Sequence, residues 1–446
     1  MDFISNRSQQ IKDMLKTLGL SSVEELFHSI PASLRLPKPL KDDGMSEYEG
    51  LQLMQSIAAK NRFSLYDSYL GAGAYEHYVP ALVESICSKS EFLTAYTPYQ
   101  PEASQGWLQA IFEFQSAICA VLGMDCANAS VYDAAAACAE ALLMAMRHHK
   151  QRKKLLISSS LHPHYQGVIR QYVENIGGEI VLIPKTAEGT LDMEWLDLHT
   201  DETCAAILFQ SPNFFGILEE GTQIKAVASK KEVITICCTH LIACGWLTPP
   251  GEWGIDIAVG DCQPLGIPLQ FGGPYAGFMA CRTEFLRQLP GRLVGQTSDR
   301  QGRRGFVLTL QTREQHIRRE KATSNICTNQ ALAALACLIT LLWYGKEGLR
   351  SLAITNYQRA AYLKAHLACI KGISIPYAAA SFNEFVVSFD HPIERVLEIF
   401  RKHQIEPGVP LNRYDASASQ SLLVAVTETK SLRQLQRYLE AAKEVS

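Results

Sequence analysis

From Trp107 onward, short apolar runs alternate with longer segments of helical periodicity, and this alternation limits the folds open to the chain. Helical segments of suitable length separate several of the early runs, an order typical of parallel strands joined by helices. It favours a mostly parallel sheet covered by helices on both faces. The last two runs can be joined without a parallel crossover, so we expect a mixed sheet. The runs are residues 154–158, 179–183, 205–209, 233–238, 256–259, 277–281 and 306–310.

Three parts of the chain differ in pattern. Apolar residues at helical spacing before Gly19 predict a helical arm over residues 1 to about 35, and another helix is predicted at 46–60. After Gln330, two long helices (331–343 and 349–370) are followed by strand 384–389, helix 393–403, strand 421–427 and helix 431–443. We therefore expect an N-terminal helical arm with an aromatic loop (1–100), a large α/β domain (101–330) and a small C-terminal α+β domain (331–446).

The aromatic loop has no amphipathic period. Residues 66–80 and 91–106 place many tyrosines among glycines and prolines. One interpretation is a loop that folds onto its own large domain. The other is a loop that reaches a cleft or a partner subunit.

Composition excludes several classes of protein. The 446 residues carry a net charge of −3, which points to neither nucleic acid nor an anionic membrane. The 13 cysteines show no Cys-x-x-Cys spacing and lie mostly in apolar runs, which predicts reduced thiols, no metal site and a cytoplasmic location. No signal peptide is recognised, and the apolar run 331–344 is shorter than the roughly 20 residues of a membrane span, so it is interpreted as a buried helix.

Six stretches of the sequence resemble the glycine dehydrogenase (decarboxylating) family, the P-protein of the glycine cleavage system. They are residues 69–75 (YLGAGAY), 77–80 (HYVP), 91–106 (EFLTAYTPYQPEASQG), 271–278 (FGGPYAGF), 291–295 (GRLVG) and the arginine-rich 303–329. The resemblance extends through nearly the whole chain. It is strongest to subunit 1 (alpha), the half-size form that corresponds to the N-terminal half of the fused protein.

This resemblance implies a fold and an activity. The fold is that of pyridoxal phosphate (PLP)-dependent transferases of fold type I, which resemble aspartate aminotransferase. The activity is the decarboxylation of glycine on PLP held by subunit 2, with release of CO2 and transfer of the aminomethyl group to the lipoyl arm of H-protein. The implied assembly is an α2β2 heterotetramer.

A PLP enzyme of this architecture needs a Schiff-base lysine and an aspartate for the pyridinium nitrogen. No lysine occurs between Lys231 and Lys321, and no acidic residue occurs from Val233 to Gly251, where the aspartate would end a strand. Comparison with the lysine-bearing loop of subunit 2 places Gln263 at the position of the lysine. We therefore expect no catalytic or cofactor-binding residue in this chain, with PLP on the partner.

The phosphate of a coenzyme would be expected before the alanine-rich helix, near residues 128–137. Ser130 and the amides that follow would suit an anion. Alternatively, Asp133 or Ser130 simply caps the helix, and an acidic residue in this turn repels phosphate.

The tyrosines and one histidine of the aromatic loop are the candidates for a cleft or an interface with the partner subunit. They are Tyr69, Tyr75, His77, Tyr78, Tyr96 and Tyr99. The arginines between Arg292 and Lys321 form either an ordinary charged surface or a docking face for an acidic partner such as H-protein. His162 and His164 either flank a ligand ring or begin a helix.

Two other functions remain open at this stage. The chain would be an autonomous PLP enzyme if Lys321 or an upstream lysine formed the Schiff base. It would be a purely structural paralogue if it never met subunit 2.

Overall fold

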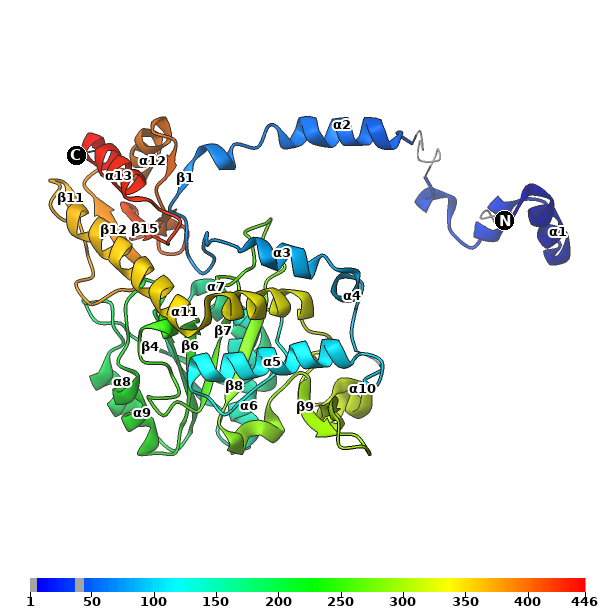
Figure 1. The fold of residues 1–446 in the computed structure, drawn as a ribbon, viewed down its shortest axis with the longest axis horizontal. Coiled ribbons are helices and arrows are strands. Elements are labelled where there is room, and N and C mark those ends of the chain that lie inside the picture. The colour runs from blue at the N-terminus through cyan, green and yellow to red at the C-terminus, as the bar shows by residue number, and fades with distance from the viewer. Residues whose placement is uncertain (1–5, 37–43, 99, 446) are drawn as a thin grey trace. The chain divides into compact units, whose positions relative to one another are not determined.

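The computed structural model describes residues 6–36, 44–98 and 100–445. The chain forms two compact units, Met1–Phe63 and Ser64–Ser446, and each is described by itself (Figure 1). The division of the chain at residues 100 and 330 remains a prediction.

The described residues of the first unit form two α-helices, and none of these residues is buried. Helix α1 (Ser8–Leu18) ends at Gly19, which adopts a left-handed conformation with φ of 68°. Helix α2 (Glu47–Ala58) begins with a capping box between Ser46 and Glu49. Both helices confirm the predicted positions, whereas part of the segment that connects them, residues 37–43, lies outside the described residues. The 3-10 turns are η1 (Val23–Phe27), η2 (Ala32–Leu34) and η3 (Phe63–Leu65), the last at the junction with the second unit.

A seven-stranded mixed sheet forms the centre of the second unit, with the strand order β2-β8-β7-β6-β5-β3-β4. Strands β3 to β7 are parallel. At one edge, β8 runs antiparallel to β7, and β2 pairs antiparallel with β8. The strands are β2 (Cys126–Ala127), β3 (Lys154–Ser158), β4 (Glu179–Ile183), β5 (Cys204–Ser211), β6 (Ile234–His240), β7 (Ile257–Asp261) and β8 (Gly277–Cys281). The mostly parallel mixed sheet is thus confirmed.

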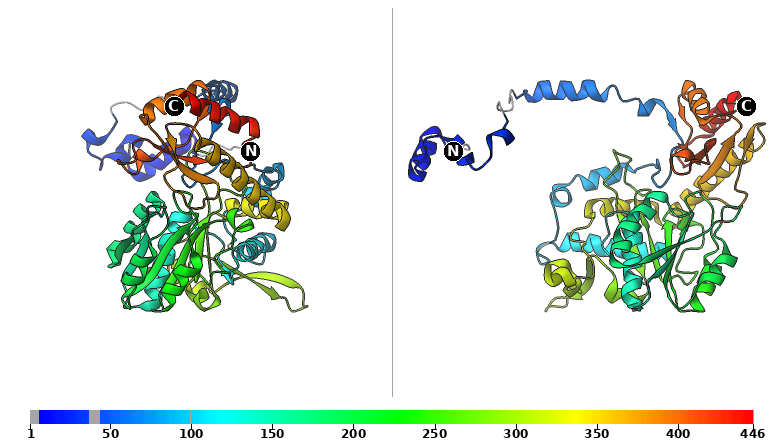
Figure 2. Two further views of the ribbon diagram at one scale, coloured as in Figure 1. Left: turned by 90° about the vertical axis from the view of Figure 1, so that its left-hand side faces the viewer. Right: turned by 180° about the vertical axis from the view of Figure 1, so that it is seen from behind.

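Helices cover both faces of this sheet (Figures 1 and 2). Successive residues of a strand point to opposite faces, so Leu155 and Ile157 pack against α6 and α7 on one face. Leu156 packs on the other face against α8 and α9, and Ala258 packs there against α5 and α11. The helices are α5 (Gln105–Leu122), α6 (Ala134–His149), α7 (Pro163–Val173), α8 (Met193–His199), α9 (Gly221–Ser229) and α11 (Ala331–Leu367).

The last predicted strand is not part of the large sheet. Residues 306–309 fall in β10 (Arg304–Thr309), which pairs with β9 (Leu293–Ser298) in a two-stranded antiparallel ribbon, and Leu310 follows this strand. The turn at Asp299 closes this hairpin locally, since the Asp299 N–H donates to the Arg303 carbonyl at 2.8 Å. Phe306 packs against Phe112 of α5 instead of against the sheet. The two-residue strand β2, too short for a sequence signal, takes the edge position.

Helix α11 is broken at Gly345, whose φ of 59° and ψ of −171° interrupt the helical backbone. The two predicted helices are therefore found on either side of this residue. The stretch from Ala334 to Leu341 is buried, as expected for a core helix. Among the described residues, α11 is the helix long and apolar enough to cross a membrane, but half of its apolar window is buried within the protein.

The C-terminal part is an α+β layer, as predicted. Its antiparallel sheet has the order β11-β12-β15-β14, and helices α12 and α13 pack on it over a core that includes Phe385, Phe400 and Tyr438. The short strand β1 (Asp67–Ser68) pairs with β13 of this part. The elements are β11 (Ile373–Ser374), β12 (Glu384–Phe389), α12 (Ile393–Lys402), β13 (Ile405–Glu406), β14 (Val409–Pro410), β15 (Ser421–Ala425) and α13 (Leu432–Val445).

The remaining elements are short. They are α3 (Ala81–Cys87), α4 (Ser90–Leu93), α10 (Gln315–Arg318) and the 3-10 turns η4 (Glu174–Ile176), η5 (Ala243–Gly245), η6 (Thr283–Gln288), η7 (Gln311–Arg313), η8 (Arg319–Lys321) and η9 (Leu411–Arg413).

Candidate functional site

A small cavity lies where the carboxyl ends of β6 and β7 meet the first turn of α6. In an open α/β sheet, this edge is where ligands bind. The cavity has a volume of about 40 Å3 and is lined by Tyr75, Ala134, His240, Asp261 and Glu384, among others. Pockets that enclose small organic ligands usually measure roughly 300 Å3 or more, and a single water accounts for about 30 Å3. The cavity therefore has no room for a coenzyme.

Gln263 lies in the loop after β7, between Asp261 and Pro264 of the cavity wall. Its side chain is buried, and its amide makes a two-sided contact with the backbone of Tyr75. The Tyr75 N–H donates to Gln263 Oε1 at 2.8 Å, and Gln263 Nε2 donates to the Tyr75 carbonyl at 2.9 Å. Gln263 Nε2 also donates to the carbonyl of Ile267 at 3.1 Å. The residue at the expected lysine position thus ties the aromatic loop to the large sheet.

Two carboxylates occupy the N-terminus of α6. Asp133 caps the helix, because its Oδ1 accepts from the Ala136 N–H at 2.7 Å. Asp261 Oδ2 accepts from the Ala134 N–H at 3.2 Å, and burial raises the pKa of Asp261 to about 7. Ser130 lies apart from this turn, and its Oγ accepts from Asn329 Nδ2 at 2.8 Å. The capping interpretation is therefore correct, and two of the amides at the start of this helix, those of Ala134 and Ala136, already bind carboxylates.

The end of β6 offers an imidazole where a carboxylate would be required. Burial and the neighbouring His77 lower the pKa of His240 to about 3, so the ring of His240 is neutral. A neutral imidazole does not hold a protonated pyridine as a carboxylate does. With carboxyl groups at the start of α6 and a neutral imidazole at the end of β6, the residues of this cavity do not fit PLP.

Tyr75 is held from the C-terminal part by Glu384, the first residue of β12. Glu384 Oε2 lies 2.8 Å from the Tyr75 hydroxyl, and its Oε1 accepts from the Ala72 N–H at 2.7 Å. Burial raises the pKa of Glu384 to about 7. A Cβ added at Gly71 would lie 2.2 Å from Glu384 Oε1, so a side chain there would displace this carboxyl group.

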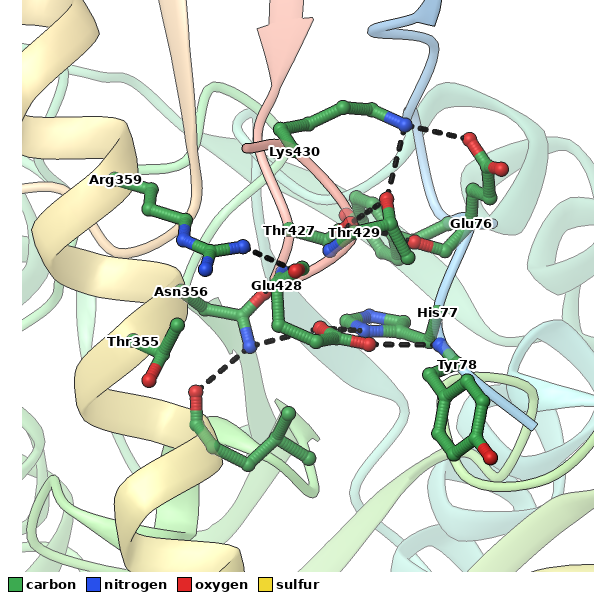
Figure 3. Close-up of polar contacts among 12 residues, drawn as sticks. Glu76, His77, Tyr78, Thr355, Asn356, Arg359, Thr427, Glu428, Thr429 and Lys430 are labelled. Atoms are coloured by element: carbon green, nitrogen blue, oxygen red, sulfur yellow. Dashed lines mark hydrogen bonds and ion pairs between the residues drawn. The ribbon is translucent and has the colours of Figure 1, made fainter. Parts of the chain in front are cut away.

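His77 is also bound by a glutamate of the C-terminal part (Figure 3). Its Nδ1 lies 2.8 Å from Glu428 Oε2, and its side chain is only 4% exposed. The Tyr75 and His77 rings both face His240, with centroids 5.3 and 6.1 Å from the His240 ring. The structure therefore brings Tyr75, His77 and Gln263 together at one place.

The other predicted tyrosines lie elsewhere. Tyr69 is fully buried in the C-terminal core, where its ring meets the edge of Tyr438 at 4.6 Å. Tyr78 and Tyr96 are exposed, at 55% and 71%. Tyr99 lies outside the described residues. Whether any of these side chains contacts a partner stays a prediction.

His162 begins a helix. Its Nδ1 accepts from the His164 N–H at 3.1 Å at the start of α7, and its Nε2 binds the Ala72 carbonyl at 2.8 Å. Burial lowers the pKa of His162 to about 4. The His162 ring therefore caps α7 and also binds the backbone of the aromatic loop at Ala72.

The predicted arginine-rich face makes many contacts within its own segment. Arg313 donates to the carbonyls of Leu310 and Gly291, and Arg303 pairs with Asp299 at 2.7 Å. Arg292 donates to Thr97 Oγ1. Whether the remaining charge of this segment attracts an acidic partner stays a prediction.

Sequence reasoning missed the acidic partners of the aromatic loop. Glu384 and Glu428 are more than 300 residues from the loop that they bind. Glu384 begins a strand and Glu428 follows one, and charged residues at strand ends usually lie at the surface. In residues 6–36, 44–98 and 100–445, no cluster of three His, Cys, Asp or Glu side chains could hold a metal ion. All thirteen cysteines are free thiols.

The sheet order, the helices on both faces and the cavity at the ends of β6 and β7 define a class, the PLP-dependent transferases of fold type I. Two solved structures show this fold at low identity. A sphingosine-1-phosphate lyase from Burkholderia pseudomallei has a TM-score of 0.67 at 15% identity and 93% coverage of both chains. A glutamate decarboxylase from Lactobacillus brevis has a TM-score of 0.70 at 12% identity, covering 94% of this chain and 97% of that chain.

Closer comparisons give the family. The family model described as "Glycine cleavage system P-protein" matches residues 1–441. A solved glycine decarboxylase (P-protein) of the glycine cleavage system, in inhibitor-bound form, has a TM-score of 0.89 at 38% identity, with all of both chains covered. The chain belongs to the glycine cleavage system P-protein family.

Curated relatives carry the name of one subunit. A protein of Protochlamydia amoebophila is 61% identical over 445 residues, with all of both chains covered. A protein of Desulfitobacterium hafniense is 45% identical over 447 residues, again with all of both chains covered. Both are named "Probable glycine dehydrogenase (decarboxylating) subunit 1", a name that implies a second subunit in those proteins.

Proposed function

We propose that this chain is the non-catalytic subunit of a glycine-decarboxylating complex in the cytoplasm. It assembles with subunit 2 as an α2β2 heterotetramer, and PLP is held by subunit 2. The complex takes glycine, releases CO2 and passes the aminomethyl group to the lipoyl arm of H-protein. This chain holds no covalent cofactor and shapes the site that its partner carries.

The two-sided hydrogen bond between Gln263 and Tyr75 is the observation that carries this proposal. The position of the Schiff-base lysine serves here to fix a loop, and the cavity beside it measures about 40 Å3. Two acids stand where a phosphate would bind. A chain that has the PLP fold but only a small cavity with these residues is expected to have a structural role in the complex, while its partner carries the chemistry.

The contribution to the partner's site comes from the outer side of the aromatic loop. Tyr78 and Tyr96 are exposed, and so is the whole side chain of Phe271. An apolar groove of about 510 Å3 runs between α3, the loop 266–274 and the first turns of α11. Because the curated relatives are named as subunit 1, we assign this surface to subunit 2. The side chains of Tyr69, Tyr75 and His77 are buried and anchor the loop to the rest of this chain.

Reconstitution tests the proposal directly. The chain and its cognate subunit 2 are purified alone and after co-expression, and glycine–bicarbonate exchange is measured for each sample. We expect exchange only when both subunits are present, and borohydride reduction should fix PLP to subunit 2 alone. Coenzyme attached to this chain, or full exchange by subunit 2 without it, contradicts the proposal.

The surface assignment has its own test. Tyr78→Ala and Tyr96→Ala should each weaken association with subunit 2 by about tenfold, as expected for an aromatic anchor of an interface. Leu198→Ala is the matched control, because Leu198 is 81% exposed on α8, far from α3 and α4 (Figure 1). If both tyrosine variants bind subunit 2 as the wild type does, the interface with subunit 2 does not include this surface.

The autonomous-enzyme alternative finds no support at Lys321. This residue is exposed on η8 and is not part of the cavity wall. A purely structural paralogue would fail to co-purify with subunit 2.

A further inference from the structure

The turn after β15, residues 427–430, binds residues 76–78 of the aromatic loop through hydrogen bonds and an ion pair (Figure 3). Thr427 Oγ1 donates to the carbonyl of Glu76 at 2.6 Å, and Lys430 Nζ pairs with Glu76 Oε2 at 2.6 Å. Between these two residues, the Glu428 carboxylate faces the next residues of the loop. Three residues of the C-terminal part, Thr427, Glu428 and Lys430, thus hold one short stretch that is about 350 residues away in sequence.

The two carboxylate oxygens of Glu428 bind different groups, one the side chain of His77 and the other the backbone of Tyr78. Its Oε2 lies 2.8 Å from His77 Nδ1, and its Oε1 accepts from the Tyr78 N–H at 2.7 Å. The carboxylate therefore fixes both the His77 ring and the peptide that leads into Tyr78. The next turn begins α3, with Pro80 at its N-cap, so the backbone is restrained on both sides of Tyr78.

Helix α11 fixes Glu428 in turn. Asn356 is fully buried, and its Oδ1 accepts from the Glu428 N–H at 3.1 Å while its Nδ2 donates to Glu428 Oε2 at 3.1 Å. Arg359 donates to the Glu428 carbonyl oxygen. The glutamate is thus held at its backbone and at its carboxylate, which makes it a rigid support.

The carboxylate is ionised in this setting. Burial alone would raise the pKa of Glu428, but the contact with His77 and the Tyr78 N–H lower it to about 2. A buried charge keeps its place only while its hydrogen-bond donors stay in position. Movement of His77 or Tyr78 away from the carboxylate would therefore be costly.

The side chain of Tyr78 is the part of this arrangement that is left exposed. Its backbone is bound to a buried carboxylate, while its side chain is 55% exposed to solvent. Because the backbone is already fixed, binding a partner through this ring orders less of the chain, as favoured for the anchor of an interface. The contacts from Asn356 through Glu428 fix the backbone position from which this ring projects.

We propose that Glu428 is a positioning residue for the glycine-decarboxylating reaction, which acts by holding the backbone of Tyr78 so that its ring meets subunit 2. The inference rests on the proposed function. It adds a residue that lies outside the aromatic loop and acts through Tyr78. The support also includes His77, whose Nε2 is buried and has no hydrogen-bond partner among the described residues.

A double-mutant cycle tests this assignment. Glu428→Gln keeps the size of the side chain but replaces one acceptor by an amide donor, which opposes the donors His77 and Asn356. We expect the Kd for subunit 2 to rise by roughly three- to tenfold, with a matching loss of exchange activity that saturating subunit 2 restores. In a Tyr78→Ala background, the same change should have little further effect, because the residue it acts through is already gone.

A stability control separates positioning from general damage. Asp67→Asn removes a carboxylate of similar burial that binds Gln434 and Arg437 in the same C-terminal part. It should lower Tm without changing the Kd for subunit 2. Glu428→Asp serves if Glu428→Gln does not fold, because it keeps the charge but is too short to reach both His77 and Tyr78; we expect it to show the same non-additivity with Tyr78→Ala.

Three results would overturn the inference. These are an unchanged Kd in a folded Glu428→Gln protein, fully additive effects with Tyr78→Ala, or an equal rise in Kd in Asp67→Asn. Failure of the wild-type chain to bind subunit 2 would instead contradict the proposed function, so the two failures are distinguishable.

Discussion

The side-chain amide of Gln263 pairs with the backbone of Tyr75 in the manner of a neighbouring β-strand, with the N–H donating to Oε1 at 2.8 Å and Nε2 donating to the carbonyl at 2.9 Å. The two residues are 188 positions apart. This contact joins the aromatic loop to the end of β7.

The first prediction concerns this amide. Gln263→Glu removes the only donor to the Tyr75 carbonyl from this side chain and places a negative charge beside Asp261. The free energy of unfolding should fall by roughly 1–3 kcal/mol, the usual cost of an unsatisfied buried group. Urea denaturation measures the change.

A lysine at the same position is a sharper variant. Gln263→Lys should not form a Schiff base with added PLP, since the cavity is too small and its phosphate end is acidic. Absorbance after borohydride reduction checks this. Gln301→Glu, at an exposed turn, is the control for stability, and a reduced coenzyme on Gln263→Lys would refute our view of the cavity.

The second prediction concerns pH. Burial raises the pKa of Glu384 from 4.5 to about 7, so between these values the folded state binds a proton that the unfolded chain has released. The free energy of unfolding is therefore highest below the unfolded pKa and falls as pH rises through about 7. For Glu384 alone, the loss amounts to roughly 3 kcal/mol.

Glu384→Gln should make the stability less dependent on pH. The amide remains neutral throughout and can still accept from the Ala72 N–H. Urea denaturation at several values between pH 5 and pH 8 measures the slope. Asp261, whose pKa is also raised to about 7, should retain part of it. Glu188→Gln, at an exposed site, should leave the slope as in the wild type, and an equally unchanged slope in Glu384→Gln would contradict the prediction.

The third prediction concerns the cap of α6. Asp133→Ala removes the acceptor for the Ala136 N–H and should destabilise the protein by about 1 kcal/mol. Asp133→Asn should have almost no effect, because asparagine caps about as well as aspartate. Thermal unfolding compares the two. Equal losses would mean that the charge of Asp133, and not its capping bond, stabilises this helix.

The fourth prediction concerns the ion pair between the buried Lys430 and Glu76 of the aromatic loop. The Lys430 side chain is 4% exposed and its partner Glu76 is 38% exposed. Lys430→Ala should cost about 1–3 kcal/mol, since it leaves Glu76 without its cation and removes packing from the ring of Tyr69. Chemical denaturation measures the loss.

The exposed pair Lys230–Asp197 provides the control for this variant. Its side chains are 60% and 53% exposed, so Lys230→Ala should cost less than about 1 kcal/mol. Equal losses in the free energy of unfolding for Lys230→Ala and Lys430→Ala would show that burial of the lysine does not increase the contribution of its ion pair to stability.

Much of the fold could be predicted, because it depends on local patterns. The parallel strands, the helices between them, the cap at Gly19 and the order of the C-terminal elements all follow from periodicity and turn residues. Residues 306–310 were assigned to the wrong sheet, because an apolar run does not specify which strand it pairs with. The pairing was decided by the tight turn at Asp299 and by the contact of Phe306 with α5.

The candidate site was only partly predictable. Gln263 and the aromatic loop were identified from motifs, but the contact between Gln263 and Tyr75 was not, and Tyr69 turned out to be a core residue of the C-terminal part. The glutamates that hold the loop gave no sequence signal. A charged residue at the end of a strand looks the same whether it meets water or a buried histidine.

The sequence by itself determined the order of the elements and the absence of a lysine between residues 231 and 321, because composition and periodicity are properties of the chain. The tertiary structure alone decided that Gln263, Glu384 and Glu428 converge on residues 72–78. The physical reason is distance in sequence. These side chains come together only after the sheet and the C-terminal part have packed, and burial then makes each of their hydrogen bonds costly to lose.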